Sequence, residues 1–365
     1  MIKKHLKSLL VAAFSLLIIT FYNTASAQEK AQNTPTEEKS TSELKPSDLI
    51  MEHIMDNHEF HFAEVNGVDV AIPLPVILYS PQRGLSTFIS SKFEHGKAIY
   101  QGYKLNERGV VEPVKADGTI DETVKVIDLS MTRNVVQMLL SLTLLVVLAI
   151  GVANKYKKNG ANVAPTGFQN AFEPVVTFIR DEVGKPNLGK KYEKYMPYLL
   201  TVFFFILINN IIGLIPGTAN VTGNIAFTLV LAVISFFVIL FSTNAHFWMH
   251  IFWPPGVPFL VKLILIPVEL LGVFIKPAAL MIRLFANMVA GHIVITCFVL
   301  LIFIFGAMST VAGWGFSPVS ILFTVFIYFI EILVAFIQAF IFTNLTAVFI
   351  GQAMEAPHHE EAGHH

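Results

Sequence analysis

Long apolar runs dominate this chain after residue 130, whereas the part before it mixes polar and apolar residues. Five of these runs approach or exceed the roughly 20 residues that an α-helix needs to cross a bilayer. Their limits are about 135–152, 196–215, 225–241, 258–305 and 319–350. The last two runs are much longer than a perpendicular crossing requires, so we expect strongly tilted or kinked helices there. The pattern predicts an all-α polytopic membrane protein with about five membrane helices, in a membrane domain that covers residues 131–354.

Residues 1–27 have the layout of a secretory signal peptide. Three lysines precede the apolar run 9–21, and small residues follow it at positions 25–27. This order predicts cleavage after Ala27. The alternative is an uncleaved first membrane anchor. Cleavage would leave the N-terminus of the mature chain outside the cytoplasm.

Residues 28–130 are expected to lie outside the cytoplasm in two parts. The stretch 28–45 is polar and has the composition of a disordered linker. Beyond it, the pair Asn66-Gly67 between apolar residues predicts a two-residue hairpin turn. Further short strands are expected near 87–91 and 98–104, between turns that contain Gly and Pro. We therefore predict a small strand-rich segment ahead of the membrane domain.

Two groups of histidines could suggest a metal site. His53, His58 and His61 are irregularly spaced and have no cysteine near them, so we expect them on the surface. The tail at 355–365 contains His-His-Glu-Glu-Ala-Gly-His-His, which does not have the His-Glu-x-x-His spacing of zinc enzymes. The sequence predicts no metal, no other cofactor and a solvated cytoplasmic tail.

The distribution of basic residues predicts the orientation in the membrane. The loop 154–195 holds eight Lys and Arg residues, whereas the turns near 216–222 and 308–318 hold none. By the positive-inside rule this loop is cytoplasmic, and five crossings from an outside N-terminus also place the C-terminus in the cytoplasm. Within the loop, apolar residues at 168, 172, 175, 176 and 179 share one face, which predicts an interfacial helix over 168–183.

The composition excludes several classes of protein. Only 14% of the 365 residues are charged and the formal net charge is −1, so the chain lacks the basic surface that a nucleic-acid partner needs. Its single cysteine, Cys297, lies in an apolar run and can form no intrachain disulfide. No Gly-x-x-x-x-Gly-Lys-Ser/Thr loop occurs, so nucleotide chemistry has to reside in another chain.

Arg283 is the strongest functional signal, because it lies in the middle of an apolar run and an arginine does not lose its proton in a protein. A charge at the centre of a membrane helix costs about 2.5–3.5 kcal/mol even on the mildest scales. Such a residue is expected to meet a carboxylate or a translocated ion. The plain alternative is a structural arginine that pairs with a neighbouring helix.

Other polar residues in the last two runs recur every seven positions, which places each set on nearly one helix face. The first set is Glu269, Lys276 and Arg283, with Asn287 one turn beyond. The second set is Thr324, Glu331 and Gln338. Two polar stripes on adjacent apolar helices supply the titratable groups that a proton or ion path through a membrane needs.

Two motifs carry a resemblance to a known family. They are Arg-Leu-Phe-Ala-Asn-Met-Val-Ala-Gly-His at 283–292 and Gln-Ala-Phe-Ile-Phe-Thr-Asn-Leu-Thr at 338–346. In this order they are similar to subunit a of the rotary, F-type ATP synthase membrane sector of bacteria. The resemblance extends more loosely over about 131–354, including Asn209-Asn210 and Gly-Leu-Ile-Pro at 213–216. The segment 28–130 is an N-terminal extension with no counterpart in the shorter members.

The resemblance implies a proton-translocating stator subunit of the cell inner membrane that is not an enzyme by itself. Its expected partners are the ring of c subunits, a b-type peripheral stalk, the rest of the complex and membrane lipid. Arg283 would face the carboxylate of the ring and separate two aqueous half-channels. The residues that would line the extracytoplasmic half-channel are Asn287, His292, Glu331 and Gln338. Glu269 would lie on the cytoplasmic route.

Many bacterial members carry Glu where His292 stands and His where Glu331 stands, so the exchanged arrangement here resembles the mitochondrial relatives. A reciprocal exchange keeps an acid–imidazole pair, which predicts contact between the last two helices. The alternative is two separate buried polar groups. On an ideal helix His292 lies opposite Arg283, so we expect it to face the last helix. Lys262 and Lys276 are expected to be snorkelling or structural.

Two other classes of function fit an intramembrane arginine less well. A secondary transporter that binds an anionic substrate would show internal repeats and broken helices in both halves of the chain, and no repeat is visible. A membrane-embedded enzyme would need a His-Glu-x-x-His motif or a Ser/His/Asp set within the apolar runs, and neither is present.

Overall fold

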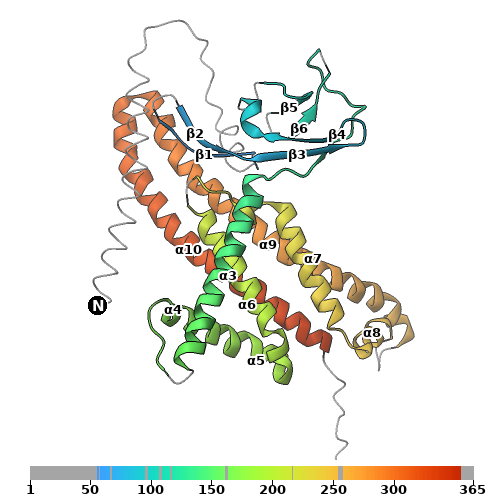
Figure 1. Ribbon diagram of the computed structural model, residues 1–365. Coiled ribbons are helices and arrows are strands. Elements are labelled where there is room, and N and C mark those ends of the chain that lie inside the picture. The colour runs from blue at the N-terminus through green and yellow to red at the C-terminus, as the bar shows by residue number, and fades with distance from the viewer. Residues whose placement is uncertain are drawn as a thin grey trace, which may run out of the picture. The chain divides into compact units, whose positions relative to one another are not determined.

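The computed structural model of the chain is shown in Figure 1. It describes residues 56, 58–65, 68–94, 98–106, 109–115, 117–160, 163–215, 217–253 and 258–354. The expected signal peptide, linker and C-terminal tail lie outside the described residues, and so does His53.

The part of the chain after residue 130 is helical, as the apolar pattern predicts. Four helical stretches of the described chain are long and apolar enough to cross a membrane, over residues 133–159, 168–213, 260–308 and 310–354. The remaining predicted crossing is α7 (Ile225–Phe241), an apolar helix of only 17 residues. The architecture is that of a polytopic membrane protein, in which four full-length helices and the shorter α7 correspond to the five predicted crossings.

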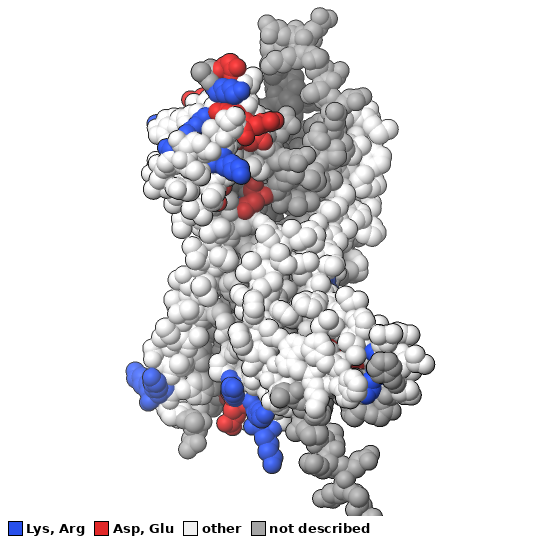
Figure 2. Space-filling view, turned by 90° about the vertical axis from the view of Figure 1, so that its right-hand side faces the viewer, with Lys and Arg blue, Asp and Glu red and all other residues white. Residues whose placement is uncertain are grey.

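The long helices meet in one apolar core. They are α3 (Arg133–Asn159), α6 (Tyr192–Gly213), α9 (Phe259–Met308) and α10 (Thr310–Met354). Leu199, Phe203 and Ile206 of α6 are fully buried in this core, which also contains Leu284 and Met288 of α9 and the inner face of α10. The outer surface also stays apolar, and Figure 2 shows most charged side chains of the described residues gathered toward the two ends of the viewed face. A broad uncharged band of this kind suits contact with lipid.

Helices α9 and α10 form a closer hairpin than we predicted. Only Ser309 separates them, whereas the sequence suggested a turn near 308–318. The Oγ atom of Ser309 accepts a hydrogen bond from the backbone N–H of Ala312 at 3.0 Å and so caps the start of α10. A Cβ atom on Gly313 would lie 2.8 Å from the Cα atom of Gly306. Gly306 and Gly313, which look like loop residues in the sequence, therefore allow α9 and α10 to approach each other closely.

The predicted interfacial helix is split into α4 (Phe168–Phe178) and a π-helical turn, η2 (Ile179–Gly184), followed by α5 (Lys185–Leu188). Its apolar face packs largely against protein. The ring of Phe172 stacks on Phe204 of α6 with centroids 4.2 Å apart, and Ile179 is fully buried. Phe168 and Phe178, which are 51% and 38% exposed, are its most exposed large apolar side chains. The sequence pattern could not distinguish a face for lipid from a face for a neighbouring helix.

A short helix that the sequence did not predict, α8 (Ala245–Phe252), follows α7. Beyond it, the ammonium of Lys262 lies 4.0 Å from the ring centroid of Trp253, and Lys262 is only 8% exposed. This lysine is held by a cation–π contact. Of the two roles that we expected for Lys262, snorkelling or structural, the structure supports the structural one, because the head group is buried.

The connection between α6 and α7 is fixed by a buried glutamine from α3. The backbone N–H of Ala219 donates to Oε1 of Gln137 at 2.7 Å, and Nε2 of Gln137 donates back to the carbonyl of Ala219. Both residues are buried. One side chain therefore satisfies both backbone groups of a loop residue that has no helix partners.

Replacing Gln137 with leucine is expected to lower the thermal unfolding midpoint of the purified protein complex. The change leaves two buried backbone groups of Ala219 without partners, at a cost of about 1–3 kcal/mol each. Thr143→Val is the matched control on α3, because Thr143 bonds only to the carbonyl of Leu139 in its own helix. Equal midpoints for the two variants would contradict this role of Gln137.

The described N-terminal part is strand-rich, as predicted. Strands β1 (Glu59–Val65) and β2 (Val68–Pro73) form the expected hairpin, in which Val65 pairs with Val68 across residues 66 and 67. The second sheet has the order β4-β3-β7, from β4 (Gly84–Ile89), β3 (Pro75–Ser80) and β7 (Ile127–Asp128). Strand β5 (Tyr103–Leu105) pairs with β6 (Val111–Pro113).

The two strands expected near 87–91 and 98–104 are shifted in the structure. Strand β4 ends before a 3-10 turn at Ser90–Phe93, and β5 begins only at Tyr103. The aromatic side chains of this region explain the difference, because Phe93 and Tyr103 are both fully buried between the two sheets. Their packing sets where the strands begin and end.

His58 is buried, so our expectation of a surface histidine was wrong for this residue. It is 3% exposed, and its Nε2 atom lies 3.3 Å from Oδ2 of Asp128. Burial alone would raise the pKa of the Asp128 carboxyl, but the hydrogen bonds with His58 and Ser130 outweigh it and bring that pKa below its ordinary value. The contact joins residues 70 positions apart, which the sequence pattern could not reveal.

Candidate functional site

Arg283 lies on the outer side of α9. The residues that α9 buries here are Leu280, Leu284 and Met288, which recur every four positions and face the other helices. Arg283 lies beside this buried stripe and is exposed. Asn287, one turn after Arg283, is half-buried. The arginine therefore points away from the protein's own core.

The surface around Arg283 on α9 is otherwise apolar. Ala279 and Ala286, one turn before and one turn after Arg283, are exposed, and the neighbouring Ile282 is 56% exposed. No salt bridge of Arg283 occurs among the described residues. A permanent cation on an apolar outer surface is accessible to a negatively charged group from outside the chain.

The polar stripe predicted on α9 does not act as one set. Lys276 turns toward α10, where its Nζ donates to Oε1 of Gln352 at 3.0 Å and lies 4.9 Å from the ring centroid of Phe349. Glu269 is half-buried and close enough to attract the Lys276 ammonium. Lys276 is thus a structural contact, one of the two roles that we expected. Arg283 makes no such contact among the described residues.

The stripe predicted on α10 is a buried one. Thr324, Glu331 and Gln338 are 7%, 7% and 6% exposed. They lie on the face of α10 that also buries Ala335, Ala339 and Phe342. The seven-residue spacing therefore identified a real face of this helix.

Glu331 and His292 approach the same part of α9 from different directions. The carboxyl group of Glu331 fills the space beside Gly291, where any Cβ atom would collide with it. The His292 imidazole instead lies beside the backbone carbonyl of Gly213 in α6. Among the described residues no hydrogen bond joins His292 to Glu331. Helix contact is present as expected, but His292 faces α6 rather than α10.

The sequence marks Asn209 and Asn210 only as part of a motif, and the structure buries both of them in α6. They are fully buried, and Nδ2 of Asn210 donates to the carbonyl of Ala335 in α10 at 3.2 Å. Ala335 lies one turn beyond Glu331. Two amides inside an apolar run were the available signal, because such groups are costly to bury without partners.

Several buried polar atoms of α6, α9 and α10 have no hydrogen-bond partner among the described residues. They are Oδ1 of Asn209, Oδ1 of Asn210, Nε2 of His292, Oγ1 of Thr324 and Oε2 of Glu331. Buried groups of this kind bind water or exchange protons, because an unpaired polar atom costs free energy in an apolar interior. The junction of α6, α9 and α10 is therefore the polar interior of the helical part.

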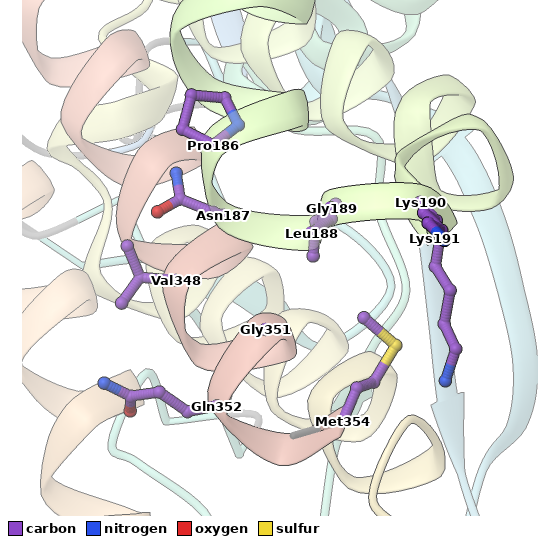
Figure 3. Close-up of a pocket in the computed structure, with 10 residues that line it drawn as sticks. All are labelled: Pro186, Asn187, Leu188, Gly189, Lys190, Lys191, Val348, Gly351, Gln352 and Met354. Atoms are coloured by element: carbon purple, nitrogen blue, oxygen red, sulfur yellow. The ribbon is translucent and has the colours of Figure 1, made fainter. Parts of the chain in front are cut away.

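A cavity of about 490 Å³ lies at the C-terminal end of α10, against α5 and the loop that follows it. Figure 3 shows the side chains of Asn187 and Gln352 beside it, from opposite elements. Gln352 is the residue that accepts from Lys276. Asn187 also donates to Oδ1 of Asn344 at 3.0 Å, and so ties α5 to α10.

Comparison with known proteins gives matches over both parts of the chain. The family model described as ATP synthase A chain matches residues 135–351, and a model described only as a domain of unknown function matches residues 49–129. A relative from Chloroherpeton thalassium named ATP synthase subunit a is 47% identical over 242 residues, which are 65% of this chain and 70% of the relative.

Two further relatives extend the comparison. ATP synthase subunit a 2 of Chlorobaculum tepidum is 39% identical over 317 residues, which are 86% of this chain and 74% of the relative. This length carries the similarity into the segment before residue 135. ATP synthase subunit a of Myxococcus xanthus is 38% identical over 269 residues, covering 72% of this chain and 83% of the relative.

Proposed function

Since the chain belongs to the ATP synthase A chain family, it is the proton-translocating stator subunit of an F-type ATP synthase membrane sector, and we propose how its residues carry the protons. Arg283 faces the carboxylate of a ring of c subunits and keeps two aqueous half-channels apart. The observation that carries this proposal is the exposed position of Arg283 on an apolar face, without a salt bridge among the described residues.

The physical role of Arg283 follows from its permanent charge. A cation beside a carboxylate in an apolar medium favours the ionised form, so a ring carboxylate that arrives there releases its proton. The same cation repels a proton that would pass directly from one half-channel to the other.

The extracytoplasmic half-channel is formed by the buried polar groups at the junction of α6, α9 and α10. Its residues are Asn287, His292, Glu331 and Gln338, to which we add Asn209 and Asn210. The support is the set of buried polar atoms that have no partner among the described residues. Water held by such atoms would connect Glu331 to the ring without a direct contact between Glu331 and His292.

The cytoplasmic half-channel runs past Glu269. This carboxylate is half-buried on α9, seven residues before Lys276. The Nζ of Lys276 donates to Oε1 of Gln352 at 3.0 Å and so joins α9 to α10. Protons therefore leave on the Glu269 side of this contact. The cavity beside Gln352 lies at the same end of α10 and gives water access from the cytoplasm.

The chain acts as one component of the synthase and does no nucleotide chemistry itself. Its proposed partners are the c ring at the Arg283 face and a b-type peripheral stalk that holds the chain still against the rotating ring. We place the N-terminal segment outside the cytoplasm of an inner membrane and the C-terminus inside, because basic residues concentrate in the loop 154–195.

Cysteine cross-linking tests which face of α9 meets the ring. Ile282 is 56% exposed beside Arg283, whereas Leu284 is 1% exposed and faces the core. In a Cys297→Ala background, Ile282→Cys is expected to form a disulfide with a cysteine placed on the outer helix of a c subunit, because only an exposed thiol can reach it. Leu284→Cys is the matched control and should not cross-link. An assembled complex in which neither variant cross-links would contradict the proposed ring interface.

A further inference from the structure

The sheet formed by β4, β3 and β7 is apolar on both faces. Its inner face buries Val76 and Leu78 of β3 against the β5–β6 pair. Its outer face presents large side chains to the outside. They are Tyr79, Leu85, Ile89, Ile127 and, just after β7, Leu129, which are 45%, 66%, 53%, 52% and 61% exposed.

Strand register makes these side chains one continuous patch, which we name the outer sheet face. Tyr79 pairs with Leu85 on one side and with Ile127 on the other. Side chains opposite each other in antiparallel strands lie on the same face, so the three are neighbours. Ile77 and its partner Thr87 extend the patch. Within the described strands this face carries no charged residue.

An antiparallel sheet that has one face in water usually alternates apolar and polar positions. Here the other layer follows that rule: Lys104 of β5 lies opposite Glu112 of β6, while Tyr103 and Leu105 point into the core. The domain therefore has one charged side and one apolar side. Contiguous apolar patches of this kind mark contact with protein or membrane.

Chain continuity identifies the contact. The backbone N–H of Leu129 donates to the carbonyl of Ile77 at 2.9 Å, and that of Met131 donates to the carbonyl of Pro75 at 3.1 Å. The membrane-length helix α3 begins two residues later, at Arg133. The outer sheet face is thus held to the start of a membrane helix by two hydrogen bonds and a link of four residues.

We propose that the outer sheet face rests on the bilayer surface, at the boundary of headgroups and acyl chains in the leaflet that α3 enters. Apolar faces of interfacial elements enter about 5–10 Å into this boundary. Tyr79 suits such a site, because its ring enters the apolar layer while its hydroxyl reaches the headgroups. The charged side of the domain, with Lys104 and Glu112, then faces water.

Site-directed fluorescence in the intact complex tests the proposal. The complex, in which an introduced cysteine is the only reactive one, carries a small fluorophore at Leu85→Cys, Thr87→Cys or Lys104→Cys. It is reconstituted in phosphatidylcholine–phosphatidylglycerol vesicles with or without a lipid that bears a nitroxide near the headgroup. We expect the lipid nitroxide to quench the labels at positions 85 and 87 and to leave the label at 104 bright. Iodide in the buffer should give the reverse order.

Thr87→Cys keeps the test decisive if the change at Leu85 disturbs folding, because Thr87 is a small side chain on the same face. Two outcomes overturn the proposal. Iodide quenching at 87 as strong as at 104 would mean that the face is open to water. Protection of 87 from both iodide and the lipid nitroxide would mean that a protein, such as another subunit or a second copy, covers it.

Discussion

Replacing Arg283 with alanine is expected to abolish ATP-driven acidification of inverted membrane vesicles, while the complex still assembles. A full charge about 4 Å from a carboxylate contributes about 4 kcal/mol at an effective dielectric constant of about 20. This corresponds to roughly a thousandfold change in the ionisation equilibrium of that carboxylate. Without the arginine, a ring carboxylate in the apolar membrane stays protonated, and its proton does not enter the exit path.

Two variants on the same helix serve as controls for this result. Lys276→Gln removes a cation that bonds to Gln352 within the chain, so a large share of pumping should survive. Arg283→Lys keeps a charge but loses the planar guanidinium and its fixed donors, so pumping should fall between wild type and Arg283→Ala. Normal acidification in the assembled Arg283→Ala complex would return this residue to a structural role.

The helices of the membrane part could be predicted from the sequence because their signal is strong and local. Apolar runs of membrane length leave few alternatives to a helix, and α7 has the limits that the pattern indicates. The least accurate boundary was the hairpin at Ser309, where glycines imitate a loop. Whether a glycine ends a helix or lets two helices touch depends on a partner helix, which the local sequence does not contain.

The candidate site was predictable as a list of residues but not as an arrangement. Seven-residue spacing placed Glu331 and Gln338 correctly on a buried face of α10. The same spacing could not show that the Lys276 side chain reaches Gln352 of α10, because a long side chain can turn from its stripe to such a partner. His292 faces the backbone of Gly213 at the C-terminal end of α6, and a pattern along one helix cannot show a third element.

Gly291→Ala is expected to reduce proton pumping by about tenfold or more, which is roughly 1.4 kcal/mol in an activation barrier. The new methyl group would collide with the carboxyl group of Glu331, and this end of a flexible side chain has to move away. Alanine is about 1 kcal/mol better than glycine in a helix interior, so a loss of helix stability would not explain lower pumping. Acidification rates normalised to assembled complex give the measurement.

Gly351→Ala is the contrasting variant, because its methyl group would collide with the backbone carbonyl of Asn187, which cannot rotate aside. We expect it to lower the yield of assembled complex, whereas Gly291→Ala should assemble normally.

A double-mutant cycle then decides whether Gly291→Ala acts through Glu331. If the methyl group of Gly291→Ala acts only by displacing this carboxylate, it has no effect once the carboxylate is absent. The single variant Glu331→Ala and the double variant Gly291→Ala with Glu331→Ala should then pump at the same rate. A double variant that pumps at the product of the two single losses would show that Gly291 matters for another reason. Displacement of the Glu331 carboxylate would then not be the cause of the lower pumping.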